Sequence, residues 1–437
     1  MSDVVDIANK LADKLVQQYL VFDGEFEAFT PWWGGNEFGY TFYPQPHYPE
    51  AKEIIGKTKW TIRTLYGCVP KELGFSEGEK AMASQVKVAV EHLNEGAMYF
   101  TSPPQIKGSH KDYRRHLNAM KEAGLELLFK GYTPRGKDAD LVNELLRYKE
   151  FQELYKLLAI PRFYLKAIGS SEMQPSQVMQ ELFRSQPMKP GLKIRIKVYS
   201  KNKEISKLFV NAMLITLRLL GIGSAANRGF GRFKLVKVNY AIGGIGKNVE
   251  LSNPKDIDNF IGEGIGDENV KCEKVYDEQF PRFPSEQEIR LIKRVCAPIG
   301  GRKYTATTVE GVLSAIGLAT LKSTWKARCG NFTGSGREYH TWVLGLPREV
   351  KGKGYVGVDR RQSYIVISPT VDNGVLLLPF FANDYHRSIF HQDHGKVEVT
   401  DIGRLTPTCE REQPSSSVAD HVSTALDWLE ELLSCER

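Results

Sequence analysis

The stretch that decides the fold runs from Lys193 to Lys237 and reads KIRIKVYSKNKEISKLFVNAMLITLRLLGIGSAANRGFGRFKLVK. Its first seven residues alternate cationic and apolar side chains, which predicts a strand with one buried and one positively charged face. Apolar residues then recur every three or four positions, as in an amphipathic helix packed on a sheet. Gly221 follows where a helix C-terminus favours positive φ, and a glycine-rich basic loop leads into a second predicted strand, Lys234 to Tyr240.

The charge of this region is local. Residues 184–237 contain thirteen lysines and arginines and a single acid, Glu204, so the segment carries +12. The whole chain carries +7, which leaves −5 for the rest. Such a concentration indicates a surface that binds a polyanion. Nucleic acid is favoured over a membrane surface, because the apolar residues of the segment are already assigned to a core.

The glycine-rich loop, Gly221 to Phe233, has two interpretations. Its glycines can simply cap the helix and turn the chain. Alternatively, a backbone without Cβ atoms lets a phosphate approach main-chain N–H groups, while arginine supplies bidentate phosphate contacts and phenylalanine a stacking face. Gly229 and Gly231, which alternate with Arg228, Phe230 and Arg232, favour the second interpretation. The loop lacks the Lys and Ser/Thr of a Walker A motif, and it follows a helix instead of opening one.

Two segments resemble a known family. A helix followed by Gly221 to Ser224, and then by Arg228 to Gly231 leading into a strand, resembles the signature loop of the RAMP superfamily, the ferredoxin-like RNA-binding proteins of CRISPR systems. An early strand ending Phe29-Thr30-Pro31, with two glycines just after it, resembles that superfamily's first strand and turn. With two such domains in one chain, the sequence is most similar to the first-numbered subunits of type III-B Cmr effector complexes.

The resemblance implies an α+β fold with two ferredoxin-like (RRM-like) RAMP domains. The first is expected over residues 1–240, with a helical insertion at about 71–160, and the second over 285–437. The glycine-, asparagine- and aspartate-rich residues 241–284 are expected to form a linker. The residues expected to contact RNA are Lys193, Arg195, Lys197, Lys201, Gly223, Ser224, Asn227, Arg228, Gly229, Phe230, Gly231, Arg232, Trp32 and Trp33.

Other elements are predicted from periodicity and capping patterns. Helices are expected at residues 4–20, 79–95, 111–130, 140–158, 285–296, 307–328 and 417–433. Strands are expected at residues 21–29, 161–168, 340–346, 355–359, 362–368 and 375–381, the last two joined by an Asp-Asn-Gly turn.

Composition restricts the remaining choices. The length of 437 residues predicts two or three domains. Six cysteines are scattered without a C-x-x-C pair, which argues against a zinc ribbon or a disulfide framework and favours a reducing cytoplasm. No apolar run reaches membrane-spanning length, and Asp3 and Asp6 replace the cations of a signal peptide. We therefore expect a cytoplasmic protein without membrane contact.

No catalytic group stands out. Metal binding by His386, His391 and His394 needs convergence that their spacing does not predict, and a Gly-Gly-Asp-Asp turn for two-metal chemistry is absent from the sequence. Some RAMP relatives cleave RNA without metal through histidine, and His110, His116 and His340 are available for this. The leading hypothesis is a non-catalytic subunit without cofactor or metal, which holds guide or target RNA near the guide's 3′ end and docks on other RAMP subunits. A metal-independent guide-processing ribonuclease and a purely structural scaffold are the alternatives.

Overall fold

The computed structural model describes most of the chain. The described residues are 14, 18–34, 48–74, 76–77, 80–81, 83–103, 110–136, 138–169, 174–243, 250–264, 281–321, 324–325, 343–344, 348–350, 353–357, 363–381, 389–392, 396–398 and 418–436. The predicted first helix at residues 4–20 and the strand at 340–346 lie almost entirely outside these ranges. None of the described helices is long and apolar enough to span a membrane.

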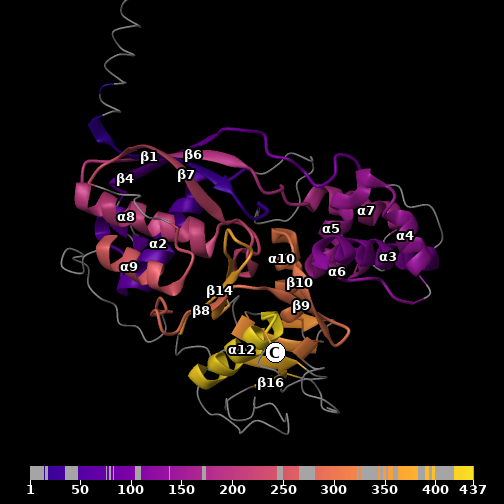
Figure 1. Cartoon of the computed structure of the whole chain (residues 1–437). Helices are drawn as coiled ribbons and strands as arrows, with labels where there is room; N and C mark the ends of the chain where they lie inside the picture. Colours follow the sequence, from indigo (N-terminus) through magenta and orange to yellow (C-terminus); the bar gives the residue numbers. More distant parts are fainter. Residues whose placement is uncertain are drawn as a thin grey trace, which may run out of the picture.

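The first domain is a four-stranded antiparallel sheet in the order β4-β6-β1-β7. Two helices, α2 and α8, cover one face of it, and α9 lies beside them (Figure 1). The order along the chain is strand, helix, strand, strand, helix, strand, which is the ferredoxin-like arrangement. These elements are β1 (Leu20–Ala28), α2 (Ala51–Tyr66), β4 (Val86–His92), β6 (Lys193–Ser200), α8 (Lys203–Ile215) and β7 (Phe233–Ala241).

The opening sequence stretch folds as predicted. Ile194, Ile196 and Val198 of β6 are buried, and α8 buries its apolar stripe against the sheet. The helix continues as a π-helical segment, η3 (Thr216–Leu220), and ends at Gly221 with φ 67°. The predictions of a strand, an amphipathic helix and a glycine cap are therefore confirmed.

A helical insertion separates the second strand, β4, from the third, β6. It begins later than the predicted position 71, because the described residues between 79 and 95 form no helix: Val86, Val88 and Val90 alternate along β4. The predicted strand at 161–168 is also wrong, since Pro161 begins helix α6, a position where its missing N–H costs nothing. The insertion comprises α3 (His110–Leu128), α4 (Ala139–Leu145), α5 (Gln152–Ala159), α6 (Pro161–Gly169) and α7 (Pro175–Ser185).

The described strands of the second half form small antiparallel sheets. β13 (Ile365–Pro369), β14 (Val375–Pro379) and β8 (Arg290–Ile292) make one, and β9 (Cys296–Ile299) and β10 (Arg302–Ala306) pair with β5 (Phe129–Lys130) of the insertion. The predicted helix at 285–296 is thus wrong. A further sheet contains β11 (Arg348–Val350), β12 (Lys353–Gly357), β15 (Ile389–Gln392) and β16 (Lys396–Glu398).

Helices complete this half. α10 (Val309–Ala319) begins at the Thr308 cap, and α12 (Val418–Leu433) closes the chain as predicted. The predicted linker contains a helix, α9 (Pro254–Gly264). The structure is α+β, but its described residues do not confirm a second ferredoxin-like domain, because no single sheet gathers the strands after β7 in that order. Short elements elsewhere are η1 (Lys71–Leu73), β2 (Ser76–Glu77), β3 (Lys80–Ala81), η2 (Lys149–Phe151) and η4 (Ala226–Arg228).

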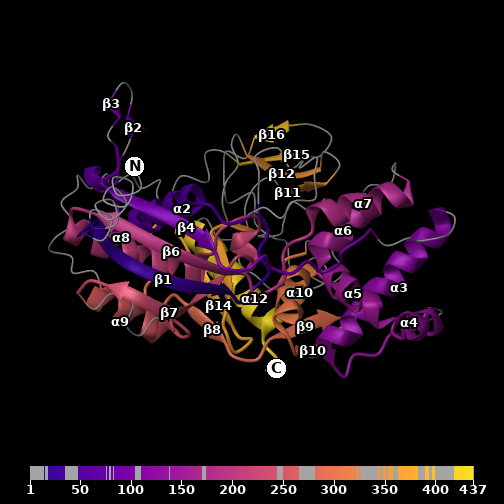
Figure 2. The ribbon, with the colours of Figure 1, turned by 90° about the horizontal axis from the view of Figure 1, so that it is seen from above.

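Two hydrophobic cores meet at the β13–β14 hairpin. One core lies between the first sheet and its helices, and the other joins the helical insertion to α10 and α12. The two strands are buried throughout, and their alternating side chains divide: Ile367 and Leu377 face the insertion's core, whereas Val366 and Leu376 face the first domain's core. Figure 2 shows β14 between the sheet and the insertion helices. The insertion therefore shares its core with the second half of the chain.

A disulfide fastens the end of the chain. Cys296 of β9 bonds to Cys435, just beyond α12, and Cys68 is also disulfide-bonded. The expectation that the scattered cysteines form no disulfides is therefore wrong. Cys296 and Cys435 lie 139 residues apart in sequence, so their spacing alone does not reveal the pairing.

Candidate nucleic-acid interface

The two segments that resemble the RAMP superfamily lie against each other. The backbone N–H of Gly231 donates to the carbonyl of Pro31 at 2.9 Å, and that of Ser224 donates to the carbonyl of Trp33 at 2.7 Å. The N–H of Arg232 donates to Thr30 Oγ1, 202 residues away, at 2.9 Å. The Thr30–Trp33 turn and the glycine-rich loop therefore form one structural unit at the end of β1 and the start of β7.

The glycines of the loop permit close packing inside the protein. A Cβ on Gly231 would lie 2.0 Å from the carbonyl oxygen of Ile222, and its φ is 65°. A Cβ on Gly229 would lie 2.8 Å from the ring of Pro369, at the end of β13. These two glycines let the loop contact its own backbone and the hairpin, which corrects the expectation that they open the backbone to phosphate.

Arg232 is the clearest correction. Its side chain is fully buried, with 0% exposed. The guanidinium donates to the carbonyl of Phe230 at 2.9 Å, to that of Ile367 at 3.3 Å and to Ser368 Oγ at 3.2 Å. Burial, and then the nearby charge of Arg218, hold the pKa of Arg232 below its usual value. Arg232 joins the loop to β13 and does not reach solvent, so we no longer regard it as a phosphate contact.

Two predicted stacking residues are also in the core. Trp32 and Phe230 are buried, Trp32 against Phe233 and Phe230 against Phe163 of α6. Extended chain sends neighbouring side chains to opposite sides, and only Trp33 remains partly exposed. Trp32 and Phe230, which were among the expected RNA contacts, are therefore buried in the structure and present no surface to a base.

A partly exposed crest remains on the loop, residues 223–228. It includes η4, none of whose residues is buried. The Nη2 of Arg228 donates to the carbonyl of Leu344 at 2.7 Å, so this arginine is partly engaged by the second half of the chain. Gly223, Ser224 and Asn227 are partly exposed as well. Of the predicted loop contacts, these four are the ones that solvent reaches.

Sequence reasoning missed Arg162. Its guanidinium lies 5.2 Å from the centre of the Trp33 ring, which also packs on Phe163 at 4.6 Å and on Phe230 at 5.8 Å. Arg162 is exposed and comes from the first turn of α6. Arg162 and Trp33 are far apart in the sequence, and no motif or spacing predicts their contact. An exposed cation on a partly exposed indole beside the crest is an arrangement that suits an unpaired base and its phosphate.

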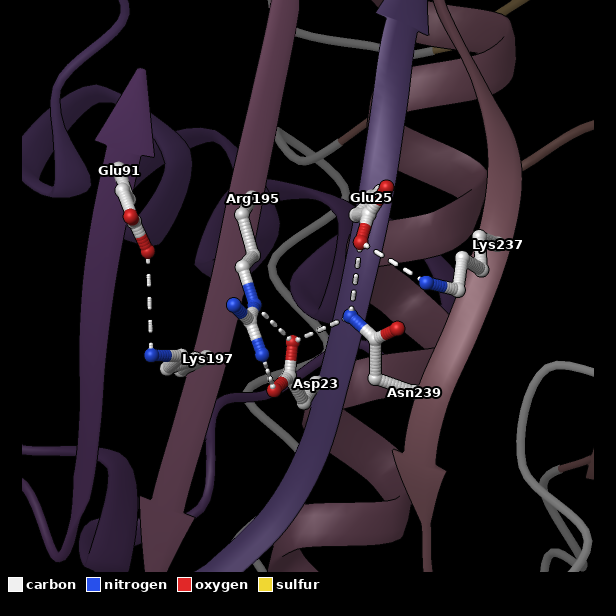
Figure 3. A network of polar contacts seen from close by, with 7 residues as sticks. All are labelled: Asp23, Glu25, Glu91, Arg195, Lys197, Lys237 and Asn239. Atoms are coloured by element: carbon white, nitrogen blue, oxygen red, sulfur yellow. Dashed lines mark hydrogen bonds and ion pairs between the residues drawn. The ribbon is translucent and has the colours of Figure 1, made fainter. Parts of the chain in front are cut away.

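The charged face of β6 is not the uncompensated surface that its sequence predicted. β1 brings Asp23, Glu25 and Glu27 between β6 and β7, and β4 brings Glu91 to the other side of β6. Figure 3 shows Asp23, Glu25 and Glu91 on this face. The open face of the four strands therefore carries four carboxylates against six cations, which are Lys87, Lys193, Arg195, Lys197, Lys234 and Lys237.

Most of these cations are paired. Lys193 lies 3.8 Å from Glu27 and Lys197 lies 3.8 Å from Glu91. On the other side of β1, Lys234 lies 3.2 Å from Glu27 and Lys237 lies 3.5 Å from Glu25. We refer to these pairs, together with that of Asp23 and Arg195, as the paired strand face.

The strongest pair on this face is that of Asp23 and Arg195. Arg195 donates from Nε and Nη2 to the two carboxylate oxygens at 2.7 and 2.6 Å, and Asn239 bridges Asp23 and Glu25. Burial by itself raises the pKa of Asp23, but the hydrogen bonds from Arg195 and Asn239 outweigh it and lower the pKa overall. Arg195 is thus committed to a carboxylate that is itself nearly buried.

Lys201 differs from these strand cations. It is exposed just beyond β6, and its Nζ lies 5.3 Å from the centre of the Tyr19 ring. No ion pair with a carboxylate involves it among the described residues. Lys201 is therefore available to an external anion.

The histidines give no constellation among the described residues. His116 Nδ1 lies 2.8 Å from the carbonyl oxygen of Asp112, on its own helix. His340, His386 and His394, and the side chains of His110 and His391, lie outside the part that the structure describes. Within the described part, no group of three or more metal-ligating side chains comes together.

Comparisons with known proteins find similar solved structures. No family model matches the chain, and no curated protein matches it. The apo crystal structure of Cmr1 from Pyrococcus furiosus is similar with a TM-score of 0.40 and 14% identity, over 83% of this chain and 88% of that one. A chain of the type III-B Cmr-beta complex bound to cognate target RNA has a TM-score of 0.43 and 14% identity, over 86% of this chain and 97% of that one. In the same complex with AMPPnP and ssDNA, the values are 0.45 and 13%, over 94% and 99%.

Proposed function

We propose that the chain is a non-catalytic RNA-binding subunit of a type III-B CRISPR Cmr effector complex, which holds guide or target RNA near the 3′ end of the guide. The carrying observation is the junction between the Thr30–Trp33 turn and the glycine-rich loop. These segments supply the sequence resemblance to the RAMP superfamily, and they hydrogen-bond to each other across 202 residues of sequence. The implied partners are guide RNA, target RNA and neighbouring RAMP subunits.

RNA would contact this junction through its exposed part. The crest offers backbone and polar groups at Ser224 and Asn227, and the Arg162–Trp33 pair offers a cation on an aromatic face. Contacts of this kind recognise phosphate and any base, so binding would be largely independent of sequence and steeply salt-dependent. The buried residues Arg232, Phe230 and Trp32 would act indirectly, by holding the crest in place.

The test uses fluorescence anisotropy with a 30-nucleotide single-stranded RNA in EDTA. The intact protein should bind this RNA and leave it full length on a denaturing gel. The double variant Arg162→Ala with Asn227→Ala should bind about tenfold or more weakly, since it loses a stacking cation and a polar contact. Asn143→Ala with Arg147→Ala removes the same residue types from exposed positions on the insertion and should bind normally.

The alternatives give other results in the same assay. RNA cut in EDTA, with cleavage abolished by one histidine substitution, would favour the metal-independent ribonuclease. The paired strand face favours a structural scaffold as the second candidate, because neutralised surface charge has little affinity for a polyanion. A scaffold would show no RNA affinity above that of the control proteins, while still joining its partner subunits. Either outcome would overturn the proposal.

A further inference from the structure

Four lysines surround the end of the first sheet where β6 finishes and α8 begins. They are Lys87, Lys201, Lys203 and Lys207, and we call them the basic rim. We propose that the basic rim is a second contact for the sugar–phosphate backbone of the RNA, separate from the crest. This inference rests on the proposed function and adds a site to it.

The rim is basic without compensation. All four lysines are exposed, and among the described residues none of them lies within 4.0 Å of a carboxylate. Glu204 is the one acid between residues 201 and 207. The contrast with β6 is direct, since Lys193, Arg195 and Lys197 each have an acid on a neighbouring strand. Among the described residues, carboxylates therefore pair with the cations of β6 but not with the lysines beyond its end.

The lysines of the rim come from separate elements: Lys87 lies on the open face of the sheet, and Lys203 and Lys207 lie on α8, which covers the other face. Lys87 of β4 lies directly opposite Tyr199 of β6, two residues before Lys201. Lys203 is the first residue of α8, and Lys207 lies four residues further along the same helix face. Burial raises the pKa of Tyr199, so its hydroxyl stays neutral and adds no negative charge to the rim.

The position of these lysines opposes the stability of α8. Cations in the first turn of a helix face the positive end of its dipole, and like charges four residues apart repel each other. The helix does not need them as a cap, because the Asn202 side chain already accepts from the N–H of Ile205 at 3.2 Å. An anionic partner would offset this repulsion. Single-stranded RNA suits the site better than a membrane or protein partner, because none of the described residues places a large exposed apolar side chain within the rim.

The rim and the crest lie at opposite ends of the same helical segment. α8 and η3 together run from Lys203 to Leu220, which are eighteen residues. At about 1.5 Å per residue the two contacts are about 25 Å apart along this axis. An RNA strand that touches both must therefore pass along the domain, and the two contacts can be removed separately.

The experiment measures anisotropy of the 30-nucleotide RNA between 0.1 and 1 M salt. The rim variant carries Lys201→Gln, Lys203→Gln and Lys207→Gln. Losing three phosphate contacts should reduce the slope of log affinity against log salt by about 2 and weaken binding on the order of 10- to 100-fold at 0.1 M. A control with Lys52→Gln, Lys130→Gln and Lys255→Gln changes the net charge equally at exposed positions elsewhere, and should keep the slope of the original protein.

The outcomes separate the two proposals. Replacement of the three rim lysines by arginine should restore both affinity and slope, which excludes a general effect on folding. If the original protein binds RNA and Arg162→Ala with Asn227→Ala weakens this binding, but the rim variant matches the lysine control, the rim proposal alone is overturned. If the original protein binds no RNA, the proposed function and the rim fail together.

Discussion

Two basic regions of this chain, both read from one stretch of sequence, use their charges in different ways. On the paired strand face, the cations of β6 and β7 remain at the surface and meet the carboxylates of β1 and β4. In the glycine-rich loop, Arg232 enters the protein and binds carbonyl oxygens, where it joins the first domain to β13. In neither region do the cations form the strongly positive surface that the net charge of residues 184–237 predicts.

The difference teaches that charge has to be counted in space. Antiparallel pairing places Asp23, Glu25 and Glu27 beside cations that are 166 to 212 residues away in the chain. Packing of the loop on the hairpin withdraws Arg232 altogether. Among the described residues, the lysines of the basic rim are exposed and lie outside the ion pairs of the strand face.

The largest effect is expected from Gly231→Ala. The new Cβ would lie 2.0 Å from the carbonyl oxygen of Ile222 with φ at 65°, so the backbone at Gly231 and at Ile222 must move apart within the loop. We expect the free energy of unfolding to fall by about 3 kcal/mol or more, measured by chemical denaturation. Gly243→Ala has a similar φ of 57° but open space around it, and should cost about 1 kcal/mol. Equal losses would mean that the loop is not tightly packed.

Arg232→Ala and Arg195→Ala compare the buried and the surface cation. Arg232→Ala leaves a cavity and removes the donor that the carbonyls of Phe230 and Ile367 share. The free energy of unfolding should fall by about 3 kcal/mol. Arg195→Ala removes a partly exposed pair, and Asn239 still donates to Asp23, so about 1 kcal/mol is expected. Thermal unfolding of both variants measures the difference. A larger loss for Arg195→Ala would reverse the assignment of roles.

Lys57→Met tests a partly exposed lysine whose pKa is lowered by desolvation and by the charge of Arg232. Burial, aided by the charge of Arg232, lowers the pKa of Lys57 from 10.5 to about 8. Below pH 8 the folded protein must hold a desolvated ammonium. Between pH 8 and 10.5 the unfolded chain keeps a proton that the folded protein has released, so stability rises with pH across this window.

The methionine variant removes this dependence. It should be more stable than the original protein by about 1–2 kcal/mol at pH 7, and the gain should disappear by pH 10.5. Lys52→Met, at an exposed position of the same helix, serves as the control for the replacement of a lysine by methionine. Denaturation curves at pH 7, 9 and 10.5 measure the stability gain of Lys57→Met. A gain that grows with pH would contradict the lowered pKa of Lys57.

The smallest effect is expected from Lys234→Gln. Its pair with Glu27 at 3.2 Å is partly exposed, so the loss in unfolding free energy should be about 0.5 kcal/mol. Salt screens such a pair, and the loss should disappear in 1 M salt, whereas that of Gly231→Ala should persist. A loss that persists in 1 M salt would mean that Lys234 stabilises the fold through a buried contact and not through a screened surface pair.

The local elements were readable because their signals lie within a few residues. Alternation gave β6, the apolar stripe gave α8, and Asp372-Asn373-Gly374 gave the turn before β14. β4 was misread because Met82, Val86, Val90 and Leu93 fit a helical spacing as well as Val86, Val88 and Val90 fit a strand. Short apolar runs do not distinguish these periods.

The site was less readable because its partners are distant in sequence. Ile367 lies 135 residues beyond Arg232, and nothing in the loop indicates that a hairpin buried on both faces will cover it. Arg162 reaches Trp33 only because α6 packs beside the turn. Both contacts depend on tertiary packing, which residue types and spacing do not encode locally.

The most direct test compares two double variants for affinity toward the same 30-nucleotide RNA. Lys193→Gln with Lys197→Gln changes the paired strand face, and Arg162→Ala with Asn227→Ala changes the crest and the Arg162–Trp33 pair beside it. Our account predicts affinity within about twofold of the original for the first and about tenfold or greater weakening for the second. Strong weakening by the strand variant with little effect of the crest variant would contradict it.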